Sequence, residues 1–188
     1  MTDADTTARS VIIWVCEGTW RATVDAALSL VPVVGSVGSV GSVGSVGSPA
    51  RFTVLHVTPP AAADAARGAY LGLLGRGGRD PGARFDEVAA AAAADLMEAA
   101  VRRLGRPCER LEIQDHPERA VVAASAHADL LIVARDGDRS RLGPKSLGRA
   151  TRFVVDHAAC PVLLVWPDLA PDVGTMPPPP HHRHHGGP

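Results

Sequence analysis

Five short apolar runs, separated by longer segments of helical pattern, limit the fold of this chain more than any other feature. Each run is rich in aliphatic residues and ends at or near a turn or charged residue: VIIWVC (11–16), RFTVLHV (51–57), CERLEIQ (108–114), DLLIVA (129–134) and PVLLVW (161–166). Short runs of this kind are typical of buried strands. Helices between successive strands imply right-handed crossovers and a parallel sheet covered on both faces. The sequence therefore predicts an α/β fold in the order βαβαβαβαβ.

Four segments carry the helical pattern between these strands: 20–31, 85–105, 117–128 and 148–158. The second is the strongest, because it is alanine-rich, acidic early and arginine-rich late, and stops at Gly105 and Pro107. Thr19 stands where it can cap the first helix. The YLGLLG stretch within residues 61–84 is interpreted as a short helix or flap.

The composition agrees with a parallel sheet under alanine-rich helices. Hydrophobic residues make up 46% of the chain and aromatic residues only 4%, so Ala, Val, Leu and Ile must build the core. A length of 188 residues suits one domain with a well-buried core. The net charge of −1 gives no general affinity for nucleic acid or an anionic membrane, and neither partner is expected.

Three features favour a cytoplasmic location. The three cysteines are odd in number and form no CxxC pair, which is typical of thiols in a reducing compartment. The N-terminus MTDADTTARS is acidic, unlike the basic start of a signal peptide. No apolar run approaches the length that spans a membrane.

Low-complexity segments mark the expected domain limits. Residues 1–10 are expected to form a flexible N-terminus and 11–166 the folded domain. Five Val-Gly-Ser copies at 34–48 have no lysine for a phosphate loop and resemble a flexible surface linker inserted in that domain. The Pro- and His-rich tail 167–188 is expected to be disordered. Its HHRHH run (181–185) could bind a divalent metal, but it lacks a defined ligand spacing, and no metal site is predicted.

Four motifs, in order along the core, resemble the universal stress protein family: CEGT (16–19), LHVTPP (55–60), HADLLIVARDG (127–137) and LGRATRFVVDHAACPVLLV (147–165). They resemble the family's V-D-G-S after the first strand, its second-strand ending, its A-D-L-I-V-x-G-x-x-G stretch and its C-P-V-L-V ending. The resemblance covers roughly 11–166, apart from 34–48 and 61–84. It implies a five-stranded sheet of order 3-2-1-4-5, a homodimer through the last strand (161–166), and a stress-associated regulator of which some relatives bind ATP.

This strand order places a ligand crevice where the first and fourth strands end, because the topology reverses between them. The ATP-binding branch of the family carries G-x2-G-x9-G-[ST] after the fourth strand, and this chain departs from it. Ala134 replaces the first glycine and narrows the approach of a ligand, Arg149 replaces the hydroxyl residue, and the loop has one extra residue. The nucleotide-binding positions that the resemblance implies are Glu17, Gly18, Thr19, Val57, Ala134, Gly137, Gly148, Arg149, Ala150 and Thr151.

Excess positive charge also points to this loop. Five cations share it with Asp136 and Asp138, for a net charge of +3: Arg135, Arg139, Arg141, Lys145 and Arg149. The loop leads into a helix N-terminus, which favours an anion, and arginine suits phosphate oxygens. The prediction is an anion site for ATP or a related adenine nucleotide. The alternative is an exposed charged loop without a ligand.

The remaining candidate residues are Glu17, two histidines and Cys160. Glu17 stands where the family has an aspartate that contacts the nucleoside, but it can equally cap the next helix. His56 and His157 are interpreted as structural histidines, and Cys160 as core packing before the last strand.

Three function classes remain open from the sequence. The leading one is a regulatory protein in which a nucleotide orders the loop 135–147 and biases a dimer or partner surface. The second is a universal stress protein without a nucleotide that acts through its dimer or partner surface. The third is an adenylate-handling enzyme, for which the crevice offers no metal-binding carboxylate pair or base, so no catalytic residue is assigned.

Overall fold

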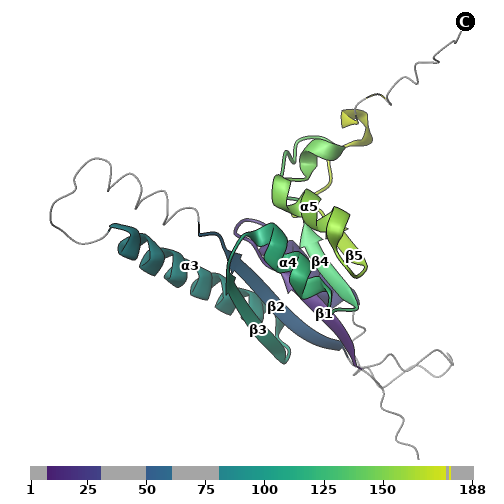
Figure 1. Cartoon of the computed structure of the whole chain (residues 1–188). Coiled ribbons are helices and arrows are strands. Elements are labelled where there is room, and N and C mark those ends of the chain that lie inside the picture. The colour runs from purple at the N-terminus through teal and green to yellow at the C-terminus, as the bar shows by residue number, and fades with distance from the viewer. Residues whose placement is uncertain (1–7, 31–49, 61–80, 177, 179–188) are drawn as a thin grey trace, which may run out of the picture.

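The computed structural model describes residues 8–30, 50–60, 81–176 and 178, with side chains described from residue 87 onward in the longest helix. Its strands are β1 (Arg9–Trp14), β2 (Ala50–Thr58), β3 (Cys108–Gln114), β4 (Leu130–Ala134) and β5 (Val162–Val165). They form one sheet of order β3-β2-β1-β4-β5, and every neighbouring pair is parallel (Figure 1). The predicted α/β class and strand order 3-2-1-4-5 are confirmed.

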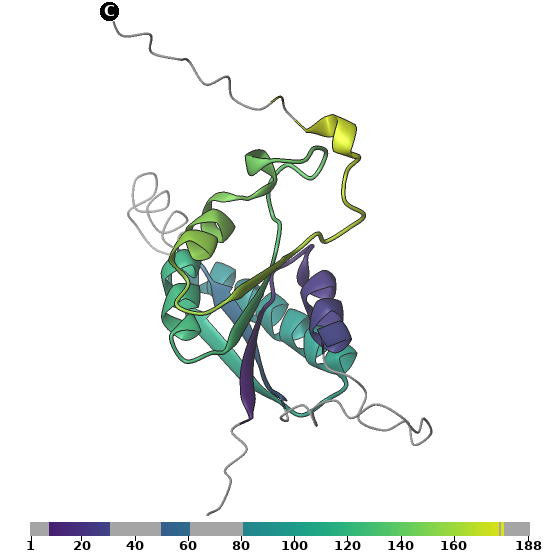
Figure 2. The ribbon, with the colours of Figure 1, turned by 90° about the vertical axis from the view of Figure 1, so that its right-hand side faces the viewer.

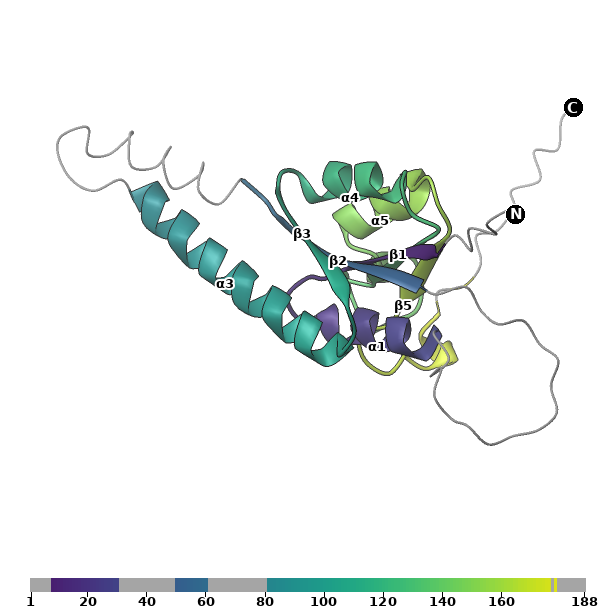
Figure 3. The ribbon, with the colours of Figure 1, turned by 90° about the horizontal axis from the view of Figure 1, so that it is seen from below.

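Helices cover both faces of this sheet: α1 (Trp20–Leu30), α3 (Pro81–Leu104), α4 (Pro117–Ser125) and α5 (Arg149–His157). Seen from below, α1 and α3 lie on one face, and α4 and α5 on the other (Figure 3). Two short 3-10 helices, η1 (Pro144–Ser146) and η2 (Val173–Thr175), follow β4 and β5. The sequence pattern did not predict either of these two 3-10 helices.

Successive side chains along each strand point to opposite faces of the sheet, and this divides the core into two halves. On β1, Ile13 packs with the α1 and α3 side and Trp14 with the α4 and α5 side. Leu131 and Ile132 on β4 divide between the two clusters in the same way. Burying one such aliphatic side chain stabilises the fold by about 1.5–3 kcal/mol. The central strands are buried on both faces, so their sequences are nearly continuously apolar.

The end of α3 follows the sequence closely. Gly105 adopts φ +60, and its amide donates to the carbonyl of Val101 at 3.1 Å, which ends the helix in a left-handed turn. Two residues earlier, Arg103 donates two hydrogen bonds to Asp25 of α1, at 2.6 and 2.7 Å. These bonds lower the pKa of Asp25 and join the two helices of this face.

The segment after β5 differs from the disorder expected for the whole tail. Residues 167–176 include η2 and return toward the loop between β4 and α5, as the yellow segment in Figure 2 shows. The reason is a set of contacts with that loop, described below. The Val-Gly-Ser repeat, residues 61–80 and the HHRHH run lie outside the described residues. Among the helices that are described, none is long and apolar enough to cross a membrane.

Candidate functional site

The ends of β1 and β4 meet at the carboxyl edge of the sheet. Ile13 on β1 pairs with Ile132 on β4, so the residues that follow each strand emerge side by side. Cys16 follows β1, and Asp136 follows β4. Burial, followed by the charge of the nearby Asp136 carboxylate, raises the pKa of the Cys16 thiol to about 12. The Cys16 thiol is therefore protonated at neutral pH.

The turn after β1 is held by its own backbone. Gly18 adopts φ +74, and the amides of Thr19 and Trp20 both donate to the carbonyl of Cys16, at 3.2 and 3.0 Å. The Thr19 hydroxyl donates to the same carbonyl at 3.4 Å instead of accepting from the first turn of α1. Thr19 therefore shapes the turn, and the cap expected from the sequence is replaced by this contact. Glu17 is exposed beside it.

The loop between β4 and α5 closes on itself. The amide of Gly137 donates to the carbonyl of Ser146 at 3.0 Å, and the amide of Asp138 donates to that of Lys145 at 2.8 Å. A Cβ atom at position 137 would lie only 2.4 Å from the Lys145 carbonyl oxygen. The close approach of two backbone segments thus requires glycine here, whether or not a ligand binds.

Asp136 occupies the start of α5. Its carboxylate accepts a hydrogen bond from the amide of Gly148 at 2.7 Å, and a Cβ atom at position 148 would lie 2.6 Å from the same oxygen. The place where the sequence suggested a ligand anion therefore holds a carboxylate of the protein itself. Sequence reasoning counted Asp136 only as a loop charge, because nothing in the spacing shows that it faces Gly148.

Three of the five loop cations have partners within the protein. Arg135 lies over the ring of Trp166, with the guanidinium carbon 4.7 Å from the ring centroid, and also donates to the Ser146 hydroxyl. Arg139 pairs with Asp168 at 2.9 Å. For Lys145 and Arg149, both exposed, no carboxylate partner is found among the described residues.

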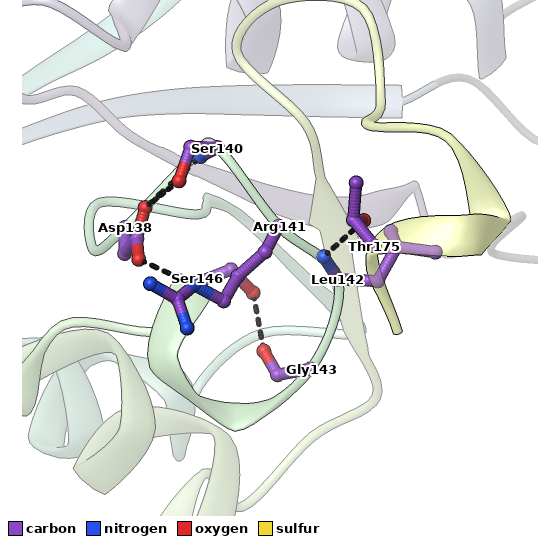
Figure 4. Close-up of polar contacts among 7 residues, drawn as sticks. All are labelled: Asp138, Ser140, Arg141, Leu142, Gly143, Ser146 and Thr175. Carbon is purple, nitrogen blue, oxygen red and sulfur yellow. Dashed lines mark hydrogen bonds and ion pairs between the residues drawn. The ribbon is translucent and has the colours of Figure 1, made fainter. Parts of the chain in front are cut away.

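The third paired cation belongs to a small polar cluster at the tip of the loop (Figure 4). Arg141 pairs with Asp138 at 2.9 Å, and the hydroxyl and amide of Ser140 donate to the same carboxylate. The Ser140 donors, and secondarily Arg141, lower the pKa of Asp138. The amide of Leu142 then donates to the hydroxyl of Thr175 at 3.0 Å, which ties the loop to η2 (Figure 4).

Four other predicted positions lie in or near the core. Val57 and Ala134 are buried in the strands, and Ala150 packs against the core beneath α4 and α5. Thr151 is also buried, and its hydroxyl donates to the Ala134 carbonyl at 3.4 Å. The hydroxyl of Thr151, which the resemblance placed at the nucleotide site, is thus turned toward β4.

The histidine contacts agree with structural roles. His56 contacts the carbonyl of Val15 through Nδ1 at 3.0 Å, and His157 contacts that of Phe153 at 2.8 Å. Burial, followed by the charge of Asp129, raises the pKa of Cys160, which packs against the core. Within the described ranges, no group of three or more His, Cys, Asp or Glu side chains could hold a metal ion.

An open pocket of about 590 Å³ lies between the first turn of α4 and the length of α5. It is lined by Glu118, Arg119, Leu147, Arg149, Arg152, Phe153 and Asp156. Arg149, which the sequence placed at the nucleotide site, thus contributes to a second concave surface on the α4 and α5 face. Sequence reasoning missed this surface because its residues come from two helices about 30 positions apart.

The comparisons with known proteins identify a family. The model of the universal stress protein family matches residues 46–165. No curated protein matches the chain significantly.

Several solved structures share the fold. The hypothetical protein MJ0577 is 15% identical, with a TM-score of 0.57, over 84% of this chain and 95% of that one. A universal stress protein in complex with cAMP is 17% identical, with a TM-score of 0.50, over 86% and 98%. A family protein from Arabidopsis thaliana with AMP bound is 17% identical, with a TM-score of 0.50, over 90% and 95%. At these identities the likeness is one of fold.

Proposed function

Because the chain belongs to the universal stress protein family, we propose that it is a stress-associated regulator that binds an adenine nucleotide where β1 and β4 end. The observation that carries this proposal is the meeting of Cys16 and Asp136 at the topological reversal of the sheet. Two exposed cations of the adjacent loop, Lys145 and Arg149, support an anionic ligand. The cAMP and AMP complexes of proteins with this fold support the adenine nucleotide class.

Asp136 decides how the phosphate is bound. A phosphate oxygen and the Asp136 carboxylate compete for the amide of Gly148, because a single N–H group cannot serve two anions well. The nucleotide must displace Asp136 or place its phosphate toward Arg149. Repulsion by the carboxylate grows with ligand charge, so AMP and cAMP fit this site better than ATP.

Nucleotide binding at this position can affect β5 through α5. Displacing Asp136 frees the start of α5, which leads directly into β5. β5 is an edge strand whose four residues are all half-buried. A homodimer through β5 is part of the proposal, and nucleotide binding then biases that dimer or a partner surface.

The test is calorimetric titration of the purified protein with cAMP, AMP and ATP at low and high salt. We expect micromolar affinity, tighter binding of AMP and cAMP than of ATP, and weaker binding in Arg149→Gln. Arg51→Gln is the matched control, because Arg51 is also exposed but lies at the start of β2. Binding that weakens equally in both variants would contradict a role for Arg149.

A second function is favoured by the same carboxylate. If Asp136 permanently occupies the start of α5, the protein is a universal stress protein that acts through its dimer or partner surface without a nucleotide. In that case neither the wild-type protein nor Asp136→Asn binds any of the three nucleotides. Light scattering with Leu163→Arg on β5, compared with the wild-type protein, then tests whether the edge strand supports a dimer.

A further inference from the structure

The pocket between α4 and α5 combines groups of both charges from two helices. Arg119 and Glu118 come from the first turn of α4, and Arg149, Arg152 and Asp156 from α5. Its lining comes from α4, α5 and Leu147, whereas the proposed crevice lies between the ends of β1 and β4. Arg149, at the start of α5, borders both. Its volume of about 590 Å³ falls within the range of small-molecule sites, about 300–1,000 Å³.

The charged groups of this pocket do not neutralise one another. In the part of the chain that the structure describes, none of the three guanidinium groups lies within ion-pair distance of Glu118 or Asp156. Arg152 donates instead to the carbonyls of Pro144 and Leu147, which fixes its side chain against the loop. The pocket therefore keeps opposite charges apart across a space in which a ligand can contact both.

The chemistry of these groups defines the ligand class. Guanidinium groups bind phosphate oxygens with two parallel N–H donors. Carboxylates accept hydrogen bonds from the hydroxyl groups of a sugar, as acidic residues do with ribose. Leu147 and the partly exposed Phe153 add apolar surface for the carbon skeleton. We infer that this pocket binds a small phosphate monoester that also carries hydroxyl groups, such as a sugar phosphate.

Suitable probes are ribose 5-phosphate, inorganic phosphate and ribose. Their binding is measured by calorimetry and by the NMR shifts of the amides of Leu147 and Phe153. Ribose 5-phosphate is expected to bind more tightly than either fragment. Arg119→Gln should weaken it about five- to tenfold, because a charge-assisted contact is lost. Arg119→Lys keeps the charge but loses the two parallel N–H donors of the guanidinium group, so its affinity should lie between those of the wild-type protein and Arg119→Gln. Arg51→Gln, an exposed arginine far from α4 in the sequence, should leave binding unchanged.

A separate variant tests the carboxylate of Glu118 in the pocket. Glu118→Gln should weaken binding of ribose 5-phosphate but not of inorganic phosphate, because only the sugar donates to this carboxylate. AMP serves to separate the two sites: binding in the crevice shifts the amides of Gly18 and Gly137, and Arg119→Gln leaves those shifts unchanged. A failure of the crevice proposal therefore does not affect the ribose 5-phosphate result.

Two outcomes would overturn the inference. One is that ribose 5-phosphate at about 10 mM shifts neither the Leu147 nor the Phe153 amide. This concentration is well above the dissociation constant expected for a specific small-ligand site. The other is that Arg119→Gln and Arg51→Gln bind it equally, which would reduce the effect to net charge. Because Arg119 is exposed, a thermal melt is enough to show that its variants remain folded.

Discussion

The carboxylate of Asp136 accepts a hydrogen bond from the amide of Gly148 at 2.7 Å, at the first residue before α5. The N-terminus of a helix carries a partial positive charge, so an anion there is stabilised. In this protein the anion is a side chain that follows β4. The affinity of the site for any external anion therefore depends on how readily this carboxylate gives way.

Asp136→Asn should raise the affinity for AMP about five- to tenfold, because the repulsion between two nearby anions is removed while an acceptor for Gly148 remains. Calorimetric titration measures the change. Asp168→Asn is the matched control: it also removes one negative charge near the loop, from the partner of Arg139, but leaves Gly148 untouched. An equal gain in both variants would mean that net charge, and not the contact with Gly148, sets the affinity.

Gly137→Ala should lower the free energy of unfolding by about 1–3 kcal/mol, because the added Cβ would lie 2.4 Å from the Lys145 carbonyl oxygen and must push the loop apart. Urea unfolding measures the loss. Gly18→Ala is the comparison, since a Cβ there meets nothing within 4 Å and only its φ of +74 is unfavourable, at about 1–2 kcal/mol. The two variants separate a steric from a conformational cost. In Gly137→Ala alone, the backbone amide at position 137 should also exchange faster with solvent, and unchanged exchange there would argue against the closed loop.

The Cys16 thiol makes stability depend on pH in the alkaline range. Its pKa is raised to about 12 in the folded protein, against 9.0 as the ordinary value. The folded state therefore keeps a proton that the unfolded state loses, and stability falls as pH rises from about 9 to 12. Between pH 8 and pH 10 this contributes a loss of about 1.4 kcal/mol, which Cys16→Ala should abolish.

Urea unfolding of the wild-type protein and Cys16→Ala at both pH values gives the difference directly. Cys108→Ala serves as the control, because burial also raises the pKa of Cys108 but this thiol lies closer to solvent. Its effect on the pH dependence should be smaller. Parallel pH profiles for Cys16→Ala and the wild-type protein would show that the Cys16 thiol is accessible to water.

The contact between the loop and η2 predicts a local change in dynamics. Thr175→Val keeps the shape of the side chain but removes the acceptor for the Leu142 amide, so this amide should exchange about two- to tenfold faster. The Ser146 amide, which donates to the Gly143 carbonyl, is an internal reference in the same measurement and should not change. Equal acceleration of both amides would indicate that the whole loop had loosened.

The fold was predictable because its signals are local. Each buried strand is a short apolar run with a turn residue after it, and the helix α3 ends at Leu104, directly before Gly105, as its sequence indicates. Right-handed crossovers then leave few topologies open. The position of the candidate crevice follows from the strand order, so the ends of β1 and β4 could be named from the sequence. Their side-chain contacts could not.

The loop shows where sequence reasoning reaches its limit. Its net charge of +3 is a property of composition, but the pairing of Arg139 with Asp168 joins residues 29 positions apart. Asp168 also lies in the segment that the sequence assigned to a disordered tail. The stacking of Arg135 on Trp166 joins two residues 31 positions apart, at the ends of two predicted strands. These contacts depend on the position of the residues that follow β5, which is set only when the sheet has formed.

By itself, the sequence determined which segments are buried and in what order they join the sheet, because burial depends on the local period of apolar residues. Only the tertiary structure decided that Asp136 meets Gly148, and that α4 and α5 together line a charged pocket. Directional contacts between polar groups require positions within a fraction of an ångström, and those positions are set by the packing of elements distant in the chain.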